Sequence, residues 1–434
     1  GLIAALKLSD KGYNVNIIES SKNIGGYLNS PIWDKITIDL GCHLFINEDD
    51  NSTDFIMSIL KNDYTKVDVN YASFFNNKKT DNIAIPDFSS IPSATKRKIE
   101  IDLLNKDRGK IEEKSLMDYY TNRFGDDILP SINSCIFKSH LIKSDSLDII
   151  SKNLLPYNRI KIFPEKESLN LKLNKGLDEI IAVKYKNLKE IKNETKKSKF
   201  NFREYYPKKN GLKFLLNKII ERLKKSNVNL LLDNRIKSFS LDNNKKYVIT
   251  DKSKYEYDYV YWSAPQYLIP KTFNFEIEVE KFVHSVPHVL IYFLAPKKFV
   301  SKYTYIHNYN LSSKCFRVSI QSNYASNGVP KDLALICCEI STFKSKRIWK
   351  NPKFYVDEIW NELLNMDLVS CNKYNNYMFF SIPSAYKLPL CGYSDILNEA
   401  IENTKKYNLI GGKSWEYSKN DIMKKIDEDL NFLL

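Results

Sequence analysis

The residues best placed to do chemistry lie near the beginning of the chain. Gly1 opens an apolar stretch with helical spacing, where a missing side chain lets backbone N–H groups approach a pyrophosphate at the positive end of a helix. Glu19 follows a short β-branched run, and an acid in that place can accept hydrogen bonds from ribose hydroxyls. Gly25 and Gly26 offer a second close backbone approach on the same side of the expected sheet. These positions together predict a site for a dinucleotide.

Two short elements position these residues. Apolar residues recur at helical spacing over residues 1–9, and Gly12 can end that helix in the left-handed conformation. Residues 13–18 are predicted to form a strand that ends at Glu19. Helix, turn, strand and acid make up half of a βαβ unit. We therefore expect a first strand and the front of the glycine loop to precede residue 1.

The rest of the chain mixes helical and strand patterns. The predicted helices are residues 115–124, 127–136, 211–225, 395–405 and 420–430. The predicted strands are residues 36–40, 228–232, 235–240, 255–262, 286–294, 303–307, 316–321, 333–339, 377–382 and 408–410. Residues 180–201 are rich in Lys, Asn and Glu and are expected to form a solvated excursion. No repeat or low-complexity linker separates these pieces, which favours two domains interwoven in sequence.

Several motifs together resemble a known family. The matching residues, all within the first 45, are Gly1-Leu2-Ile3-Ala4-Ala5, Glu19, Gly25-Gly26, Ser30 and Asp39-Leu40-Gly41-Cys42-His43-Leu44-Phe45. They resemble the N-terminal FAD-binding region of the flavin amine oxidase superfamily. That group includes protoporphyrinogen oxidases, phytoene desaturases and, more distantly, UDP-galactopyranose mutases. Gly1 aligns with the third glycine of its G-x-G-x-x-G fingerprint, which implies that about a dozen residues precede it.

The resemblance continues, more weakly, along most of the chain. Residues 206–212 are similar to the family's entry to a helix, with Asn210 where a glycine is usual. Ile236 matches the position whose backbone contacts the adenine, and Ala264-Pro265 matches the end of a family strand. Residues 408–413, followed by Asn420-Asp421-Ile422, resemble the closing flavin-binding motif, whose helix N-terminus lies near the pyrimidine edge of the flavin.

The resemblance implies FAD as cofactor and a set of residues that hold it. The set is Gly1, Glu19, Ser20, Gly25, Gly26, Tyr27, Gly41, Cys42, His43, Leu44, Ile236, Ala264, Pro265, Gly411, Gly412, Asp421 and Ile422.

The expected fold class is α/β. A Rossmann-like FAD-binding domain, made of residues 1–70, 205–268 and 395–434, is expected to be interwoven with an α+β substrate domain. Residues 71–204, largely helical, and residues 269–394, which supply a mixed or antiparallel sheet, are expected to form that second domain.

His43 is the candidate catalytic residue. The family pattern places it beside the isoalloxazine ring, where it either tunes the flavin or satisfies backbone groups. Cys42 and His43 are expected to face opposite sides of a strand, because consecutive strand residues alternate. Tyr27 stands where many amine oxidases carry Arg, which argues against amine oxidation in the narrow sense.

Other residues are interpreted as structural. The remaining histidines show no metal-ligand spacing and are expected to be ordinary surface or core residues, so no metal is predicted; they are His140, His284, His288 and His307. Aromatic residues on the predicted sheet either wall a substrate pocket or fill the core; they are Tyr292, Phe293, Tyr303, Tyr305, Tyr309 and Phe316.

Composition limits the partners. The net charge is +14, but Lys, Asn and Ile are all abundant, so compositional bias explains it better than binding to nucleic acid. The seven cysteines form no CxxC pair, which indicates reduced thiols in a cytoplasmic protein. No apolar run approaches the ~20 residues of a transmembrane helix. The expected partner is a small-molecule substrate; peripheral membrane contact stays open, and no oligomeric state is predicted.

Three functions remain open at this point. In the first, an FAD-dependent oxidase, dehydrogenase or desaturase takes a hydride from an organic substrate onto flavin N5. In the second, the chain is similar to UDP-galactopyranose mutase, which needs paired arginines for a diphosphate. The available arginines are Arg159, Arg203, Arg317 and Arg347. In the third, the chain is a catalytically inactive scaffold.

Overall fold

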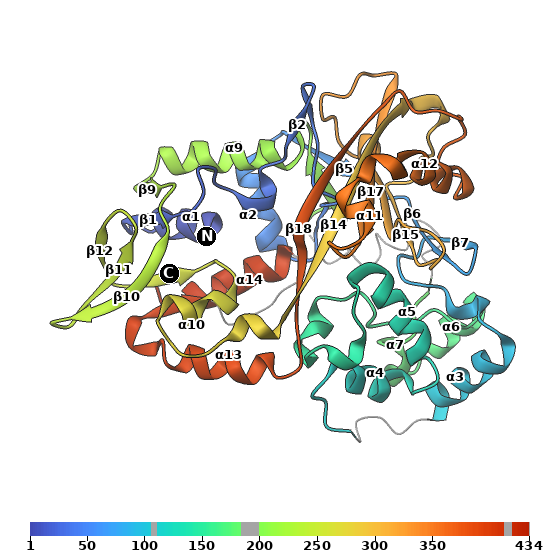
Figure 1. The fold of residues 1–434 in the computed structure, drawn as a ribbon, viewed down its shortest axis with the longest axis horizontal. Helices are drawn as coiled ribbons and strands as arrows, with labels where there is room; N and C mark the ends of the chain where they lie inside the picture. The colour runs from blue at the N-terminus through green and yellow to red at the C-terminus, as the bar shows by residue number, and fades with distance from the viewer. Residues whose placement is uncertain (106–110, 184–198, 412–418, 434) are drawn as a thin grey trace.

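The chain folds into a mixed α/β structure built around a seven-stranded mixed sheet. The computed structural model describes residues 1–105, 111–183, 199–411 and 419–433. Figure 1 shows the sheet at the upper right and a layer of helices below it. A second group of strands and helices lies at the left and contains residue 1.

The large sheet brings together residues from three distant parts of the chain. Its strand order is β18-β14-β17-β16-β15-β6-β7, and every pairing is antiparallel except β15 with β6. The strands are β6 (Tyr71–Phe75), β7 (Lys78–Asp81), β14 (Val283–Pro296), β15 (Tyr305–Asn308), β16 (Arg317–Ile320), β17 (Leu333–Ser341) and β18 (Asn376–Pro389).

Both faces of the sheet are covered, which explains why β14 is an almost continuous apolar run. Ile291 and Phe293 pack with Trp360 of α12 (Val356–Asn365) on one face. Leu290 and Tyr292, which alternate with them, face the opposite side.

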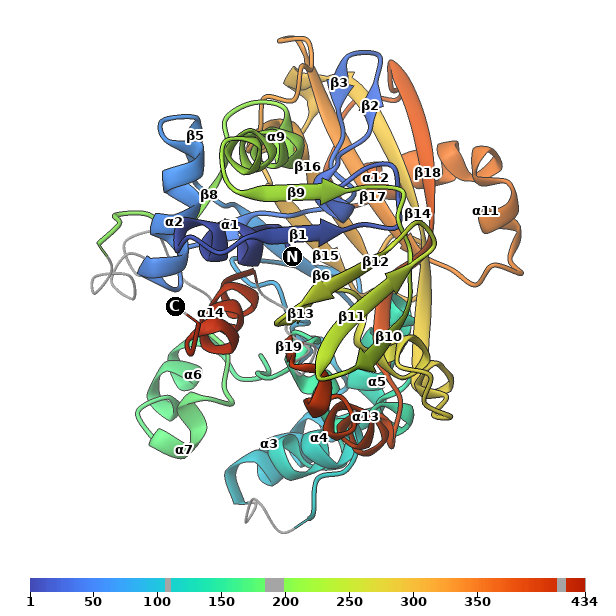
Figure 2. The ribbon, with the colours of Figure 1, turned by 90° about the vertical axis from the view of Figure 1, so that its left-hand side faces the viewer.

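The second group of strands is split into small sheets. β1 (Val15–Ile18) lies parallel to β9 (Val228–Leu231), and β13 (Val260–Trp262) lies parallel to β19 (Leu409–Gly411). Figure 2 shows β1 and β9 side by side above β13 and β19. The helices around them are α1 (Leu2–Asp10), α2 (Asp50–Leu60), α9 (Gly211–Lys224), α10 (Ile269–Thr272), α13 (Tyr393–Glu402) and α14 (Lys419–Leu430).

A β-meander stands at the edge of this group. β10 (Ile236–Asp242), β11 (Lys245–Thr250) and β12 (Lys254–Tyr257) pair antiparallel in sequence order. Asn243 and Asn244 form the first turn with φ of 46° and 64°, the left-handed pair that a two-residue hairpin turn requires.

An ion pair links helices α1 and α14. Lys7 of α1 forms an ion pair with Asp427 of α14. This contact gives one of the acidic residues near the end of the chain a packing role.

The helical layer packs against one end of the large sheet. Its helices are α3 (Ser93–Asn105), α4 (Leu116–Phe124), α5 (Leu129–His140), α6 (Glu165–Leu171) and α7 (Lys175–Asp178). Ser115 begins α4 with a capping box, in which its hydroxyl accepts from the Asp118 backbone N–H at 3.1 Å and the Asp118 carboxylate accepts from the Ser115 N–H at 2.8 Å. Val286 and Leu388 of the sheet belong to the core of this layer.

Most predicted elements are confirmed, and two are wrong. Residues 255–262 are not one strand, because the chain leaves β12 and enters β13 in a different sheet. The strand predicted at residues 36–40 ends early: β3 (Ile36–Thr37) pairs only with β2 (Ile32–Trp33). Of the predicted excursion at residues 180–201, residues 184–198 lie outside the described part of the chain.

A further three-stranded sheet has β8 in its centre. β4 (Phe45–Ile46) and β5 (Tyr64–Val67) both pair with β8 (Glu204–Pro207). The remaining α-helix in the described part of the chain is α11 (Arg347–Lys350). No helix in the described part of the chain has the length and hydropathy that a membrane crossing requires.

A buried carboxylate, Asp39, connects these groups. It accepts hydrogen bonds from Ser30 Oγ at 2.6 Å, Tyr206 Oη at 2.5 Å and the Leu212 backbone N–H at 3.0 Å. The last of these donors lies in the first turn of α9, where a negative charge is favoured. Residue 210 precedes that helix with φ of 52°, a conformation that Asn tolerates, which accounts for Asn in place of glycine.

The backbone of Asp39 is bound to the large sheet. Tyr292 Oη donates to the Asp39 carbonyl at 2.8 Å, and Gln321 Nε2 donates to the same oxygen at 2.9 Å. Asp39 therefore fixes the segment that follows it against both α9 and the sheet.

Removing the Asp39 carboxylate is expected to destabilise the protein strongly. Asp39→Ala leaves three buried donors without their acceptor, at a cost of ~1–3 kcal/mol each. We expect the free energy of unfolding in urea to fall by at least ~3 kcal/mol. Ser30→Ala, which removes one donor, is the matched control and should cost about 1 kcal/mol. Equal losses for the two variants would contradict the role of Asp39 as a shared acceptor.

Candidate functional site

A cavity of about 580 Å³ lies between the segment after Asp39, the start of α14 and the large sheet. Its volume is within the range of small-molecule sites. The lining residues are Tyr27, Cys42, His43, Leu44, Ile46, Glu48, Val69, Leu154, Glu204, Tyr305, His307, Arg317, Ser384, Ala385, Tyr386, Lys387, Leu388, Lys419, Asn420 and Ile422.

One wall is a row of side chains across the sheet. Glu339 of β17 is the cross-strand partner of Arg317 on β16, which in turn faces His307 on β15. Cross-strand partners point to the same face of a sheet. The register therefore brings an acid, a guanidinium and an imidazole, far apart in sequence, onto the face toward the cavity.

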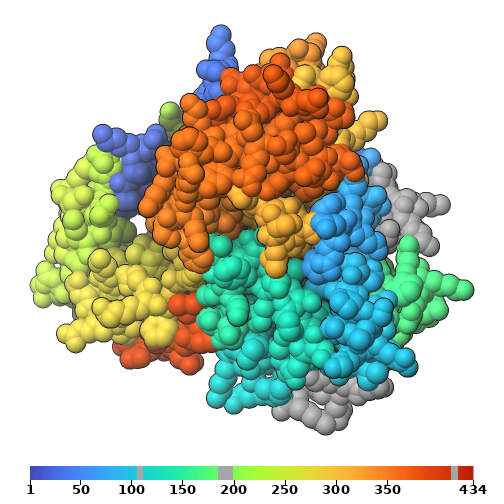
Figure 3. All heavy atoms as spheres, turned by 45° about the vertical axis from the view of Figure 1, so that its right-hand side comes forward, coloured from blue at the N-terminus to red at the C-terminus, as the bar shows by residue number. Residues whose placement is uncertain are grey.

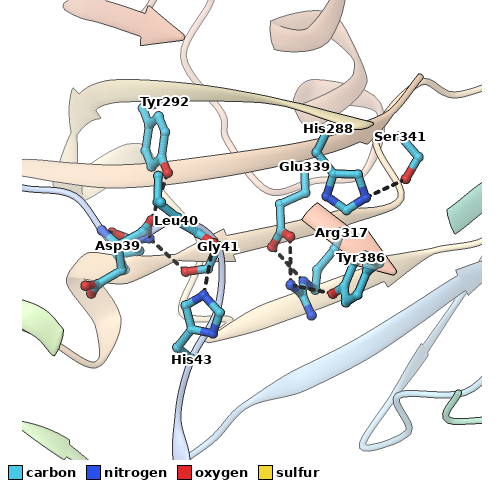
Figure 4. A network of polar contacts seen from close by, with 11 residues as sticks. Asp39, Leu40, Gly41, His43, His288, Tyr292, Arg317, Glu339, Ser341 and Tyr386 are labelled. Atoms are coloured by element: carbon cyan, nitrogen blue, oxygen red, sulfur yellow. Dashed lines mark hydrogen bonds and ion pairs between the residues drawn. The ribbon is translucent and has the colours of Figure 1, made fainter. Parts of the chain in front are cut away.

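Arg317 and Glu339 form a bidentate ion pair. Nε to Oε1 measures 2.6 Å and Nη2 to Oε2 measures 2.7 Å. Their side chains are only 10% and 2% exposed. Figure 4 shows this pair with the Tyr386 hydroxyl beside it, at 3.5 Å from Arg317 Nη2. Because each charge is neutralised by the other, the wall presents a fixed dipole to the cavity.

Gly41 lies where a side chain would be strained and crowded. Its φ is 104°, and an added Cβ would come within 3.0 Å of a Glu339 carboxylate oxygen. Gln321 Nε2 donates to the Gly41 carbonyl at 3.2 Å. The loop can therefore approach the ion pair only with glycine at this position.

His43 is held as a neutral imidazole. Its Nε2 lies 3.0 Å from the Leu40 carbonyl, which only accepts, so Nε2 carries the proton and Nδ1 is left as an acceptor. Burial lowers the pKa of His43 to about 3, with the charges of Lys419 and Arg317 acting in the same direction. The Tyr27 ring lies 5.2 Å from the imidazole. His43 is therefore uncharged near neutral pH.

Two further charged groups reach the cavity. Lys419 Nζ donates to the Leu44 carbonyl at 2.9 Å, and burial lowers the pKa of this ammonium to about 8. Burial raises the pKa of Glu204 to about 7, against the opposing charge of Arg203. Both groups can change charge near neutral pH.

The predicted site residues separate into two regions. Tyr27, Cys42, His43, Leu44 and Ile422 line the cavity. The prediction that Cys42 and His43 face opposite sides is wrong, because residues 38–44 form a loop rather than a strand and Gly41 turns the backbone.

Several other predicted residues lie outside the cavity wall, at the ends of strands. Glu19 follows β1, and its carboxylate accepts from the Ser21 N–H at 2.8 Å and from Ser20 Oγ at 3.5 Å. Ala264 and Pro265 follow β13, and Ile236 begins β10.

Gly1 and Gly411 meet at the carboxyl end of β13. A Cβ on Gly1 would come within 2.6 Å of Ser263 Oγ, and Gly411 pairs with Trp262. Asp421 lies in the first turn of α14, while Gly412 is outside the described residues. The carboxyl ends of parallel strands are where nucleotides bind in open α/β sheets.

Sequence reasoning missed several residues of the cavity. His307 was interpreted as ordinary, and Glu204, Lys419 and the pairing of Arg317 with Glu339 were not predicted. A usable signal exists for the ion pair, since each partner is a lone charge in an apolar strand. Of the six strand aromatics considered, Tyr305 lines the cavity, whereas Tyr292 and Phe293 are core.

The residues present fit a flavin. The cavity wall combines an aromatic ring at Tyr27, the ammonium of Lys419 and the constrained backbone of residues 41–44. The described residues contain no cluster of His, Cys, Asp and Glu that could hold a metal ion.

The family comparison covers most of the chain. The model of the flavin containing amine oxidoreductase family matches residues 1–313. The chain belongs to this family. Its members contain flavin, which confirms the prediction of FAD as cofactor. No curated protein sequence matches the chain.

Solved structures share the fold at low sequence identity. A reduced UDP-galactopyranose mutase has 14% identity and a TM-score of 0.72, covering 100% of this chain and 91% of that one. A protein assigned as a protoporphyrinogen oxidase from Exiguobacterium sp. 255-15 has 12% identity and a TM-score of 0.69, covering 100% and 96%. Putrescine oxidase bound to putrescine has 11% identity and a TM-score of 0.60, covering 100% and 96%. These likenesses show the fold alone.

Breaking the buried ion pair is expected to cost more than removing it. Arg317→Met leaves the Glu339 carboxylate buried without a partner, which should lower the free energy of unfolding by about 3–5 kcal/mol. The double variant Arg317→Met, Glu339→Leu should recover much of that loss. A double-mutant cycle in urea measures both effects.

The control for this cycle is Lys218→Met, which breaks a surface ion pair with Glu221 and should cost less than about 1 kcal/mol. If the double variant were less stable than Arg317→Met alone, desolvation of the buried pair would not be the dominant cost.

Glu204 is expected to make stability depend on pH. Its pKa is about 7 in the folded protein, above the ~4.3 of an unfolded chain, so the folded state binds the proton more tightly. Its contribution is largest in acid and is lost as pH rises from about 4 toward 7. Glu204→Gln should therefore gain melting temperature relative to the native protein between about pH 4 and pH 7. Parallel profiles for the two proteins would contradict this, and Glu221→Gln is the exposed control.

Proposed function

We propose that the protein is an FAD-dependent oxidoreductase that oxidises a small organic substrate in the cavity beside residues 41–44. One observation carries the proposal. Two segments with flavin-binding motifs, one near each end of the chain, line the same cavity, and the large sheet forms its opposite wall. Tyr27 and residues 42–44 come from the first segment, and Asn420 and Ile422 from the second. The facing wall, with Tyr305, His307 and Tyr386, is free to vary with the substrate.

The proposed cofactor contacts follow the family motifs. Gly1, Glu19 and Ser20 would serve the adenosine end, together with Ile236, Ala264 and Pro265. The flavin end would be held by Gly25, Gly26 and residues 41–44, together with Gly411, Gly412, Asp421 and Ile422. The open space around Gly26, where an added Cβ would meet nothing within 4 Å, leaves room for such a ligand.

FAD, when bound, supplies the redox chemistry by accepting a hydride from the substrate. The residues of the chain then have three tasks. Lys419 places a cation near residues 42–44, because its Nζ donates a hydrogen bond to the Leu44 carbonyl. Neutral His43 offers Nδ1 as an acceptor and is a poor proton donor near neutral pH. The neutralised pair Arg317–Glu339 orients polar substrate groups without adding a net charge.

The arginines argue against the mutase. A nucleotide diphosphate calls for a pair of guanidinium groups. Among the arginines in the described part of the chain, Arg317 alone lines the cavity, and Glu339 already binds its Nε and Nη2. Arg159 and Arg347 are exposed and do not line the cavity, and Arg203 pairs with Glu204. We therefore place the oxidoreductase first.

Anaerobic titration tests the function. The purified protein should carry about one FAD per chain, and an oxidisable substrate should bleach the flavin absorption with no added acceptor. A panel of amines, porphyrinogens and polyenes is the probe, and UDP-galactopyranose with dithionite-reduced protein tests the mutase. Absence of flavin would support a scaffold, and turnover of the sugar nucleotide alone would support the mutase; either result contradicts the proposal.

A bulky variant tests the cavity itself. His307→Trp fills space on the sheet wall, so it should raise KM or abolish bleaching by substrate while the FAD content stays unchanged. Lys302→Trp, at an exposed position shortly before β15, is the matched control and should leave bleaching unchanged. Unchanged kinetics in the His307 variant would place the substrate elsewhere.

A further inference from the structure

A cationic and aromatic surface lies on the opposite side of the sheet from the cavity. We call it the 343–354 surface; its exposed members are Phe343, Lys344, Lys346, Arg347, Lys350, Lys353 and Phe354. It is formed by the turn after β17, helix α11 and the turn before α12. Figure 3 shows the orange region that contains these residues spread over the upper part of one face.

The charge of this surface is not compensated locally. Five cations occur within residues 343–354, and no acid does. None of the five forms an ion pair with another described residue. The two acids that follow are engaged elsewhere: Asp357 accepts from Tyr374 Oη at 2.8 Å, and Glu358 pairs with Lys314 at 2.8 Å.

The segment is anchored from beneath. Ile348, Pro352 and Val356 are buried, and the first and last belong to the core between α12 and the sheet. Lys350 and Lys353 lie between these buried residues in the sequence and are exposed, as are the three cations before Ile348. The surface is thus a fixed feature of the fold rather than a solvated tail.

Two large apolar rings are exposed among these cations. Phe354 is 67% exposed and Phe343 is 39% exposed. The Arg347 guanidinium lies 4.7 Å from the centre of the Phe354 ring. Exposed rings next to cations match the interface of a bilayer, where rings enter the headgroup region and cations meet anionic lipids.

We propose that the 343–354 surface docks on a membrane that contains anionic lipids. Only two exposed rings accompany the five cations, without the series of stacking aromatic residues that binds a single nucleic-acid strand, so this composition suits an anionic lipid surface better. The core residues of α12 and Cys338 lie on the same face of β17 as this surface, whereas Glu339 lies on the other. Docking would therefore leave the cavity wall untouched, and the inference does not depend on the proposed function.

Vesicle cosedimentation with a charge-matched control tests the proposal. The full chain should bind vesicles of phosphatidylcholine with about one third phosphatidylserine and not vesicles of phosphatidylcholine alone. The variant Lys346→Ala, Arg347→Ala, Lys350→Ala, Lys353→Ala should bind at least about tenfold more weakly. The control Lys11→Ala, Lys224→Ala, Lys225→Ala, Lys237→Ala removes the same charge from exposed lysines on other elements and should retain the affinity. Equal weakening in both variants would show adsorption by net charge and overturn the proposal.

A second variant separates ring insertion from charge. Phe343→Ser, Phe354→Ser should bind normally at low ionic strength and lose binding faster than the native protein as salt screens the cations. Far-UV circular dichroism of every variant should match the native protein, since all of these side chains are exposed. The proposal would be contradicted if the protein bound a single-stranded oligonucleotide but not the anionic vesicles, and if the four-alanine variant bound that oligonucleotide more weakly. The partner of the surface would then be nucleic acid.

Discussion

The carboxylate of Asp39 is the contact on which the geometry of the site depends. It accepts from Ser30, Tyr206 and the first turn of α9, while its own carbonyl is bound by the sheet residues Tyr292 and Gln321. These donors come from segments that are far apart in the chain. Burial raises the pKa of Asp39, and the hydrogen bonds from these segments act in the opposite direction.

The position of the loop at residues 41–44 follows from that contact. Once Asp39 is fixed, Gly41 runs against the Glu339 carboxylate and turns Cys42 and His43 into one cavity. The sheet register then decides what faces them: Glu339, Arg317 and His307 lie in one row because β17, β16 and β15 pair in that register. Under the proposed function, the constrained loop would hold the cofactor, and the sheet wall would contact the substrate.

Local patterns were sufficient for much of the fold. The helical patterns of residues 115–124 and 211–225 and the β-branched run before Glu19 each depend on neighbours in sequence, and each predicts its element correctly. The family membership likewise depends on short motifs that could be identified along the chain.

The site itself depends on features that no local pattern contains. The break between β12 and β13 reflects pairing with β19, about 150 residues away in the chain, and alternation at Cys42 fails because of the backbone turn at Gly41. The pairing of Arg317 with Glu339 depends on the register between β16 and β17, and both strands lie outside the flavin motifs. His307 and Glu204 become cavity residues only through that long-range assembly.

The most direct measurement is a crystal structure of the protein with FAD. The isoalloxazine ring should occupy the cavity, in contact with residues 42–44 on one side and within reach of Lys419, with the adenosine near Glu19 and Gly1. A flavin bound away from this cavity, or a loop at residues 39–44 that has left the Asp39 contacts when FAD is bound, would contradict the account.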